Sequence, residues 1–353
     1  MTSARGTTRL SPAAMGHEQA RTPAVQGAPA VQEQAEAPAV QGAPAVKGMQ
    51  ARAPAVHAGR GAPRVLYICG DSRCGSTLLQ NLMALQPGVC VLGEVRRLYS
   101  LAQSGAECSC GQPVAECPFW QRIAAQTGLP LREIRTWPEQ SDWRATAGFA
   151  VGRWLTRAGA VSVARLILRG EQAGARMCAR VYEAAAAVTG QPVVVDSSKS
   201  SPLLAQLRGV PGVSLAPVLM LRDGRGIVWS KMKRTGISVD VAVNRWLFGA
   251  RWMLATMASV PERERVTLRY EDLCVDPAGV LKKALAPVGV PVEQIDLTLL
   301  PAERHQLGGS PRFRGDAPKA IELDERWRKQ MPAEALRVFE RRAGALNRRF
   351  GYE

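Results

Sequence analysis

Short runs of apolar residues recur along the chain, and glycine or polar residues follow each of them. Uninterrupted apolar runs of this length are typical of strands that are buried on both faces of a parallel sheet. Leucines at helical spacing follow the first run, which indicates a helix packed against that sheet. The pattern predicts an α/β fold, a mostly parallel sheet flanked by helices. The four clearest runs lie at residues 65–69, 89–92, 192–195 and 213–221.

Longer segments with apolar residues every three or four positions are predicted to be helical. They lie at about residues 121–190, 244–257, 277–286 and 333–350. Asp276 precedes Pro277, which is a common way for a helix to begin. The helices between 121 and 190 carry no residues whose chemistry is readable, and we expect them to cover a substrate site.

The first sixty residues do not share this pattern. No aromatic residue precedes Tyr67. The tripeptide Pro-Ala-Val recurs among alanine, glutamine and glycine, at Pro23, Pro29, Pro38, Pro44 and Pro54. Such a composition buries too little apolar surface to offset the entropy lost on ordering. We therefore predict a disordered tail over residues 1–62, or upstream sequence from a mis-set start codon, and one domain over residues 63–353.

The chain carries 46 lysines and arginines against 30 acidic residues, a net charge of +16. Such a charge often indicates nucleic-acid binding, but the basic residues are scattered and no nucleic-acid motif is present. A small polyanionic ligand explains the charge, and we predict no nucleic-acid partner. The start lacks the apolar segment of a secretory signal, and the chain contains no uncharged run of eighteen apolar residues. We therefore expect a cytoplasmic protein without a membrane span.

The first apolar run leads into a loop with phosphate-binding spacing. Gly70 and Gly75 are placed as in G-x-x-x-x-G, and a helix is predicted to begin at Ser76. The backbone N–H groups of such a loop and the helix dipole together favour an anion. A nucleotide-hydrolysing loop has lysine where this chain has Ser76, and the cation here is Arg73 instead.

This loop resembles the 5′-phosphosulfate loop of sulfotransferases, which use 3′-phosphoadenosine 5′-phosphosulfate (PAPS) as donor. Cys74 departs from the small serine that is usual there. The resemblance implies an α/β sulfotransferase domain that covers about residues 64–352. Its mostly parallel, P-loop-like sheet would be flanked by helices, with a helical cover over the acceptor site. It also implies donor contacts from Arg73, Cys74, Gly75, Ser76, Thr77 and Leu78.

The strongest single match is Arg222-Asp-Gly-Arg after the fourth apolar run, with Ser230 eight residues later. In sulfotransferases an arginine and a serine at this spacing bind the 3′-phosphate, and the planar guanidinium suits phosphate. The resemblance further implies that Arg234 contacts the nucleotide. The same holds for Tyr270, which follows the family's last core strand, and for a closing loop near residues 308–315 that contains Arg312, Arg314 and Gly315.

Glu94 and Lys199 each follow an apolar run, so both are expected at the sheet edge where α/β proteins bind ligands. Tyrosylprotein and carbohydrate sulfotransferases have a catalytic base and a sulfate-contacting lysine at these places. The resemblance therefore implies Glu94, Arg73 and Lys199 as the catalytic residues. Because the other two histidines lie in the tail, His305 alone could act as the histidine base of cytosolic small-molecule sulfotransferases.

Cys108, Cys110 and Cys117 resemble part of a zinc knuckle. A fourth ligand is not visible nearby, so we favour a structural turn lined by thiols and predict no metal ligands. The remaining cysteines are expected to be thiols, since disulfides are rare in the cytoplasm.

The resemblance implies transfer of a sulfuryl group from PAPS to a hydroxyl or amine, with Glu94 as general base. A sulfuryl group carries less charge than a phosphoryl group, so no metal is required. A small molecule, carbohydrate, lipid or peptide remains open as the acceptor. One alternative is a small-molecule kinase, which would need lysine after Gly75 and a metal-holding carboxylate such as Asp196; another is a non-catalytic protein that binds a nucleotide or RNA.

Overall fold

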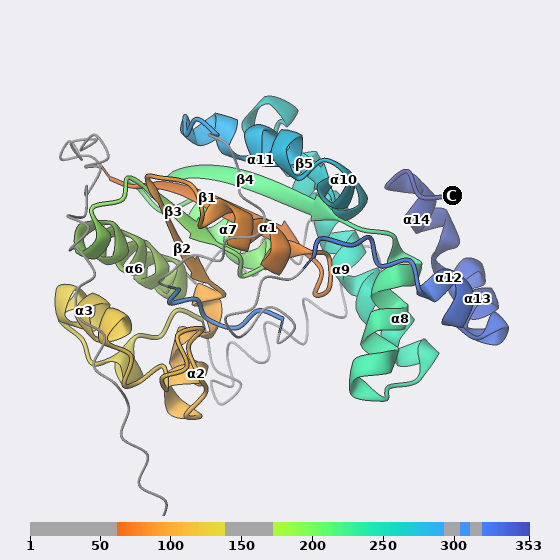
Figure 1. Cartoon of the computed structure of the whole chain (residues 1–353), viewed down its shortest axis with the longest axis horizontal. Coiled ribbons are helices and arrows are strands. Elements are labelled where there is room, and N and C mark those ends of the chain that lie inside the picture. Colours follow the sequence, from red (N-terminus) through yellow and green to blue (C-terminus); the bar gives the residue numbers. More distant parts are fainter. Residues whose placement is uncertain (1–61, 138–171, 293–303, 311–319) are drawn as a thin grey trace, which may run out of the picture. The chain divides into compact units, whose positions relative to one another are not determined.

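Five apolar segments pair into one parallel sheet (Figure 1). The computed structural model describes residues 62–137, 172–292, 304–310 and 320–353, all within the unit Ala55–Glu353. The sheet order is β2-β3-β1-β4-β5, and every neighbouring pair is parallel. The predicted α/β class is therefore confirmed. The strands are β1 (Arg64–Gly70), β2 (Val89–Gly93), β3 (Val193–Asp196), β4 (Ser214–Leu221) and β5 (Val266–Arg269).

The chain reverses its direction of travel across the sheet at β1. It runs outward from β1 to β2, returns through β3 to the side of β1, and then crosses to β4 and β5. Tyr67 of β1 lies opposite Asp196 of β3 on one side and Pro217 of β4 on the other. In open α/β sheets such a reversal leaves a crevice at the carboxyl ends of the strands, where ligands bind.

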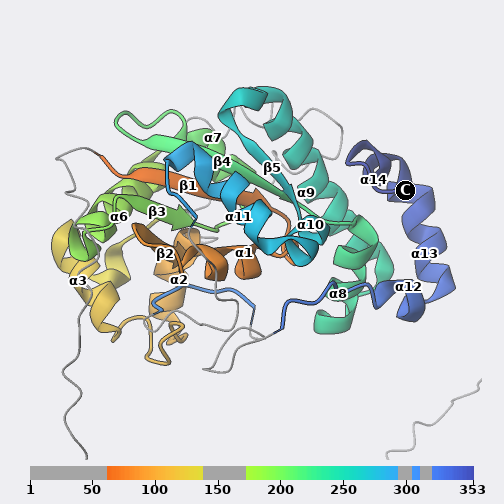
Figure 2. The same cartoon turned by 45° about the horizontal axis from the view of Figure 1, so that its top comes forward.

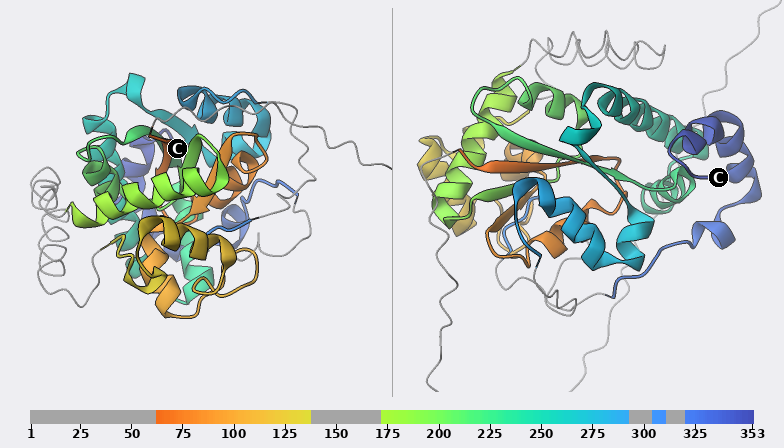
Figure 3. Two further views of the ribbon diagram at one scale, coloured as in Figure 1. Left: turned by 90° about the vertical axis from the view of Figure 1, so that its left-hand side faces the viewer. Right: turned by 90° about the horizontal axis from the view of Figure 1, so that it is seen from above.

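Alternate residues of β1 belong to different apolar cores. Tyr67 packs into the larger core and Leu66 into the smaller one, since successive side chains of a strand point to opposite faces. Figures 2 and 3 show the helices on the two sides of the sheet. The smaller core contains α1 (Ser76–Met83), α10 (Tyr270–Val275) and α11 (Pro277–Leu285); the larger contains α2 (Leu98–Gln103), α3 (Pro118–Thr127), α6 (Ala173–Thr189), α7 (Ser201–Leu207), α8 (Gly224–Thr235) and α9 (Val239–Ser259).

Most predicted elements are present, with small shifts of their ends. The helix expected at 244–257 begins earlier, because the side chain of Ser238 caps it by accepting a hydrogen bond from the N–H of Val241. The helix expected at 333–350 is interrupted. It comprises α13 (Ala333–Phe339), a π-helical turn (Glu340–Gly344) and α14 (Ala345–Arg349), and α12 (Trp327–Gln330) precedes it.

Short 3₁₀ turns complete the described chain. They are Val95–Arg97, Leu131–Glu133, Glu262–Glu264 and Ala286–Val288. Of the helical region expected at about 121–190, α3 and α6 are seen, and residues 138–171 lie outside the described residues. Within the described ranges, no helix combines the length and apolar composition that crossing a membrane requires.

Candidate functional site

Each strand of the sheet leads into one residue that the sequence predicts for the site. Because the strands are parallel, their carboxyl ends lie at one edge, and these residues are brought to the same side of the sheet. Arg73 lies in the loop after β1, Glu94 follows β2, Lys199 follows β3, Arg222 follows β4 and Tyr270 follows β5.

Gly75 makes the loop after β1 possible. It precedes α1 with a left-handed φ of 95°, and a Cβ atom at this position would lie 2.5 Å from Cδ2 of Tyr270. Only glycine adopts this conformation and admits the ring so closely. Cys74 is fully buried in the smaller core, where burial raises the pKa of its thiol. Its side chain therefore faces the protein interior, and a ligand in the loop could contact only its backbone.

Arg73 and Lys199 have strained backbones. Among the described residues they are the non-glycine positions with positive φ, 74° for Arg73 and 59° for Lys199. The Arg73 carbonyl accepts a hydrogen bond from Nη1 of Arg222 at 2.9 Å, and the Lys199 N–H donates to the carbonyl of Ile68 at 3.1 Å. Such strain costs on the order of 1–3 kcal/mol per residue and concentrates at functional sites.

Positive charge is gathered around Ser230. Arg73 Nε donates to Ser230 Oγ at 2.9 Å, and Arg234 lies one helical turn beyond Ser230 on α8. The pKa of Arg73 is lowered by burial and further by the positive charges of Arg234 and Arg222. Cations that disfavour one another's charge are stabilised by a bound anion, so this is a candidate anion site.

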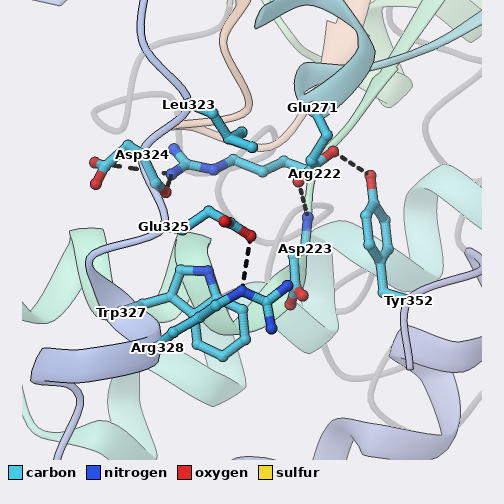
Figure 4. Close-up of a pocket in the computed structure, with 9 residues that line it drawn as sticks. All are labelled: Arg222, Asp223, Glu271, Leu323, Asp324, Glu325, Trp327, Arg328 and Tyr352. Carbon is cyan, nitrogen blue, oxygen red and sulfur yellow. Dashed lines mark hydrogen bonds and ion pairs between the residues drawn. The ribbon is translucent and has the colours of Figure 1, made fainter. Parts of the chain in front are cut away.

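Arg222 is fixed on several sides. Its guanidinium lies 4.2 Å from the centre of the Tyr270 ring and 3.8 Å from the carboxylate of Asp324. The pKa of Asp324 is lowered to about 2, chiefly by hydrogen bonds from Arg326. Figure 4 shows a small pocket beside Arg222 that does not include Glu94 or Lys199. It is lined by Arg222, Asp223, Glu271, Leu323, Asp324, Glu325, Trp327, Arg328 and Tyr352.

Glu94 and Lys199 form a largely buried ion pair. Lys199 Nζ lies 2.7 Å from Glu94 Oε1 and also donates to the carbonyl of Ser197 at 2.9 Å. Burial alone would raise the pKa of Glu94, but Lys199 and Arg97 outweigh burial and hold this pKa below its usual value. Glu94 is therefore ionised at neutral pH, with Lys199 as its main counter-charge.

The segment 304–310 joins the two halves of the site. The N–H of Gly309 lies 3.4 Å from Glu94 Oε1, and the N–H of the next residue, Ser310, donates to Thr77 Oγ1 at 3.1 Å. Arg73 Nη1 also reaches Ser310 Oγ at 3.4 Å. Sequence reasoning missed Ser310 although it lies in the basic loop singled out for its arginines. Arg312, Arg314 and Gly315 of that loop lie outside the described residues.

His305 lies beside the cysteines, and its ring stacks on Phe119 with centroids 4.8 Å apart. Its Nδ1 atom is 3.3 Å from Cys117 Sγ, a contact between residues 188 positions apart. One ligand atom from each of Cys108, Cys110, Cys117 and His305 lies within 4.8 Å of the others. A candidate fourth ligand, which the sequence did not reveal nearby, therefore lies on a distant segment.

Asp196, the candidate metal-holding carboxylate of a kinase, is fully buried. It accepts hydrogen bonds from the Tyr182 hydroxyl and the Ser198 N–H, both at 2.6 Å. Burial raises its pKa to about 6. These partners fix the carboxylate inside the protein, which disfavours its use as a ligand for a metal–nucleotide complex.

Neither a protein-family model nor a curated protein matches the chain. Among solved structures, the sulfotransferase domain from the olefin synthase of Synechococcus PCC 7002 is 17% identical, with a TM-score of 0.46 over 83% of this chain and 96% of that chain. The sulfotransferase domain from the curacin biosynthetic pathway is 18% identical, with a TM-score of 0.45 over 80% of this chain and 98% of that chain. Both similarities are distant, so the function is argued below from the site.

Proposed function

We propose that this protein transfers a sulfuryl group from PAPS to a hydroxyl or amine of an acceptor molecule. The observation that carries the proposal is the cluster of Arg73, Arg222 and Arg234 around Ser230, joined through Ser310 and Gly309 to the Glu94–Lys199 pair. Several clustered cations beside a carboxylate and an amine fit a donor that carries both a phosphosulfate and a separate phosphate.

The donor contacts divide between two ends of the nucleotide. The loop N–H groups from Gly75 to Thr77 and the Arg73 side chain would bind the 5′-phosphosulfate, as a helix N-terminus binds anions. The N–H of Leu78, by contrast, donates to the carbonyl of Gly75 at 3.0 Å. Arg222, Ser230 and Arg234 would bind the 3′-phosphate through charge-assisted hydrogen bonds. Tyr270, whose ring packs on Arg222, would line the nucleotide.

The chemistry requires one proton acceptor and stabilisation of one developing charge. Glu94 takes the proton of the acceptor hydroxyl or amine while the oxygen or nitrogen of the acceptor forms a bond to sulfur. The bond between sulfur and the bridging phosphate oxygen breaks, and adenosine 3′,5′-bisphosphate leaves. Lys199 and Arg73 stabilise the charge on that oxygen. When Lys199 turns toward the bridging oxygen, Glu94 loses its main counter-charge. The pKa of Glu94 then rises, and Glu94 becomes a better base.

The decisive experiment compares two donors on the same protein. The full chain is incubated without added magnesium with sulfur-labelled PAPS, and in parallel with magnesium and ATP labelled in its terminal phosphate. Each reaction receives small molecules, carbohydrates, lipids and peptides, and mass spectrometry identifies the product. We expect label transfer from PAPS alone, and its loss in Glu94→Gln. Transfer from ATP would identify a kinase, and tight nucleotide binding without any transfer would identify a non-catalytic binding protein.

A further inference from the structure

The three clustered cysteines lie on a tight turn and at the start of a helix. Glu107 and Pro113 form an antiparallel bridge, and within the turn the Cys108 N–H donates to the carbonyl of Gln112 at 2.8 Å. Gly111, with a left-handed φ of 87°, completes the turn after Cys110. Cys117 immediately precedes α3. The local backbone therefore places three thiols within one short stretch of the chain.

The four ligand atoms lie within 4.8 Å of one another, close enough to surround one metal ion. Cys110 Sγ lies 3.6 Å from Cys117 Sγ, which lies 3.3 Å from Nδ1 of His305. In a tetrahedral zinc site with Zn–S bonds of about 2.3 Å, neighbouring sulfurs are about 3.8 Å apart. A disulfide would need about 2.05 Å, and all three cysteines are free.

The surroundings of the cluster support its ligands. Cys108 and Cys117 are buried, and Cys117 lies at the N-terminal end of α3, where the helix dipole favours a thiolate. Stacking on Phe119 fixes the plane of the His305 ring. A fixed ligand orientation is a usual contribution of the surroundings of a metal site. Four ligands of the Cys₃His type leave no open position, which is typical of structural rather than catalytic zinc.

We propose that Cys108, Cys110, Cys117 and His305 bind one Zn²⁺ ion in a closed tetrahedral site that fastens the segment 304–310 to the turn 107–117.

The proposed zinc site lies at one end of the segment 304–310. At the other end of this segment, Ser310 contacts Arg73 and Thr77, next to the loop after β1. Next to His305, Gln306 exchanges two hydrogen bonds with Ser109, its N–H donating to Ser109 Oγ at 2.7 Å and its carbonyl accepting from the Ser109 N–H at 3.2 Å. Leu307 then pairs with the end of β2, through its N–H to Leu92 and its carbonyl to the N–H of Glu94, both at 2.8 Å. The ion would therefore hold in place the residues that contact Glu94. Any effect on turnover rests on the proposed function, but zinc binding does not.

The first test measures metal directly in the full chain, purified without a histidine tag from zinc-supplemented cells. Elemental analysis should find about one zinc per chain. X-ray absorption should find three sulfurs at about 2.3 Å and one nitrogen at about 2.0 Å. Cys110→Ser, at the exposed ligand, and His305→Ala should lose the zinc. The matched control Cys274→Ser, outside the cluster, should keep it.

Three results of this test would overturn the site. In the first, wild-type protein neither contains zinc nor takes it up under reducing conditions. In the second, both ligand variants retain zinc. In the third, the cluster holds iron or a Cys110–Cys117 disulfide instead of zinc. None of them depends on sulfotransfer, so failure of the proposed function leaves the zinc result standing.

The second test addresses fastening, with hydrogen exchange before and after chelation of the wild-type protein. The amides of Leu307 and Gly309 should exchange at least about tenfold faster once zinc is removed, whereas those of β1 and β4 stay protected. Restoring zinc should restore protection. Unchanged exchange at Leu307 in zinc-free, folded protein would show that the ion does not fasten this segment.

Discussion

At the scale of single residues, the candidate anion site concentrates like charges that a bound anion would neutralise. Arg73 is partly buried next to Arg222 and Arg234, and its backbone is held in a left-handed conformation. Both features destabilise the free protein, and a bound anion would reduce the repulsion between the like charges. The strongest effects of substitution are therefore expected on nucleotide binding.

Arg222→Ala should weaken binding of adenosine 3′,5′-bisphosphate roughly tenfold to a hundredfold, because a charge-assisted contact contributes about 1.5–3 kcal/mol. AMP lacks the 3′-phosphate, so its weaker binding should change little. Calorimetry on both nucleotides measures this, with Arg208→Ala, at an exposed ion pair, as control. Equal affinity of the wild-type protein for the two nucleotides would refute the 3′-phosphate site.

Glu94→Gln should lower kcat by about 10²–10⁴-fold, the usual effect of removing a general base. Affinity for adenosine 3′,5′-bisphosphate should be nearly unchanged, because the base meets the acceptor. His305→Asn should cost much less, since His305 lies beside Cys117. The assignment of the base is wrong if the glutamine variant keeps near-full activity while the asparagine variant loses turnover. Zinc content is measured alongside.

Asp196 should make stability fall as pH rises from about 4 to about 6. Its pKa is about 6 in the folded protein, where burial raises it, and about 3.9 when unfolded. Between these values the folded state binds more protons, so the free energy of unfolding decreases with pH. The full effect is on the order of 3 kcal/mol.

Asp196→Asn should remove this pH-dependent contribution. Denaturant unfolding from pH 4 to pH 7 gives the free energy of unfolding of both proteins, and the contribution of Asp196 is the pH-dependent part of the difference between them. The lowered pKa values of Glu94 and Asp324 affect both proteins alike and cancel in this difference. Parallel curves would show that Asp196 does not titrate in this range.

At the scale of elements, the loop after β1 depends on one glycine. Gly75→Ala should lower the free energy of unfolding by about 2–4 kcal/mol, because it combines a left-handed backbone with a Cβ atom 2.5 Å from the Tyr270 ring. Gly190→Ala is the matched control. Gly190 also has positive φ, 69°, but no neighbour within 4 Å, so this variant measures backbone strain alone. Equal losses in denaturant unfolding would mean that the ring moves aside without cost.

The sequence predicted elements well where one local signal decides them. Four of the strands could be found because apolar runs ended by polar residues suffice, whereas β5, whose sequence is Val-Thr-Leu-Arg, was indicated only by resemblance. Helix α11 could be found because Asp276 caps it through the N–H of Gly279. The π-helical turn Glu340–Gly344 could not be found. It lies among distant partners: Glu340 pairs with Arg225, and the buried Asn347 accepts a hydrogen bond from the N–H of Gly224 at 2.9 Å. Such contacts leave no trace in local periodicity.

The same distinction applies to the candidate site. Glu94, Lys199 and Arg222 could be placed at the sheet edge because each follows an apolar run. The strand order, the contact of Ser310 with Arg73 and the position of His305 beside Cys117 all depend on segments far apart in the sequence. No spacing rule on one chain reveals them.

At the scale of the whole molecule, composition separates the first 62 residues from the rest. A chain that begins at Ala62 should keep the melting temperature and the activity of the full protein, because Pro-Ala-Val repeats offer little apolar surface to a core. Residues 1–61 lie outside the described residues, so this division stays a prediction. Calorimetric melting of both proteins tests it. A drop of several degrees would show that the segment packs on the domain.

The pairing of Leu307 with the end of β2 has a consequence for biosynthesis. A Cβ atom on Gly93 would lie 2.4 Å from the carbonyl oxygen of Leu307, so the two backbones meet in a contact that only glycine permits. Glu94 and Gly309 are 215 residues apart. At about 5–20 residues per second, a ribosome needs roughly 10–40 s between them. During that interval, the edge of β2 that later pairs with Leu307 has no partner. Exposed strand edges of this kind can pair with other chains or bind chaperones.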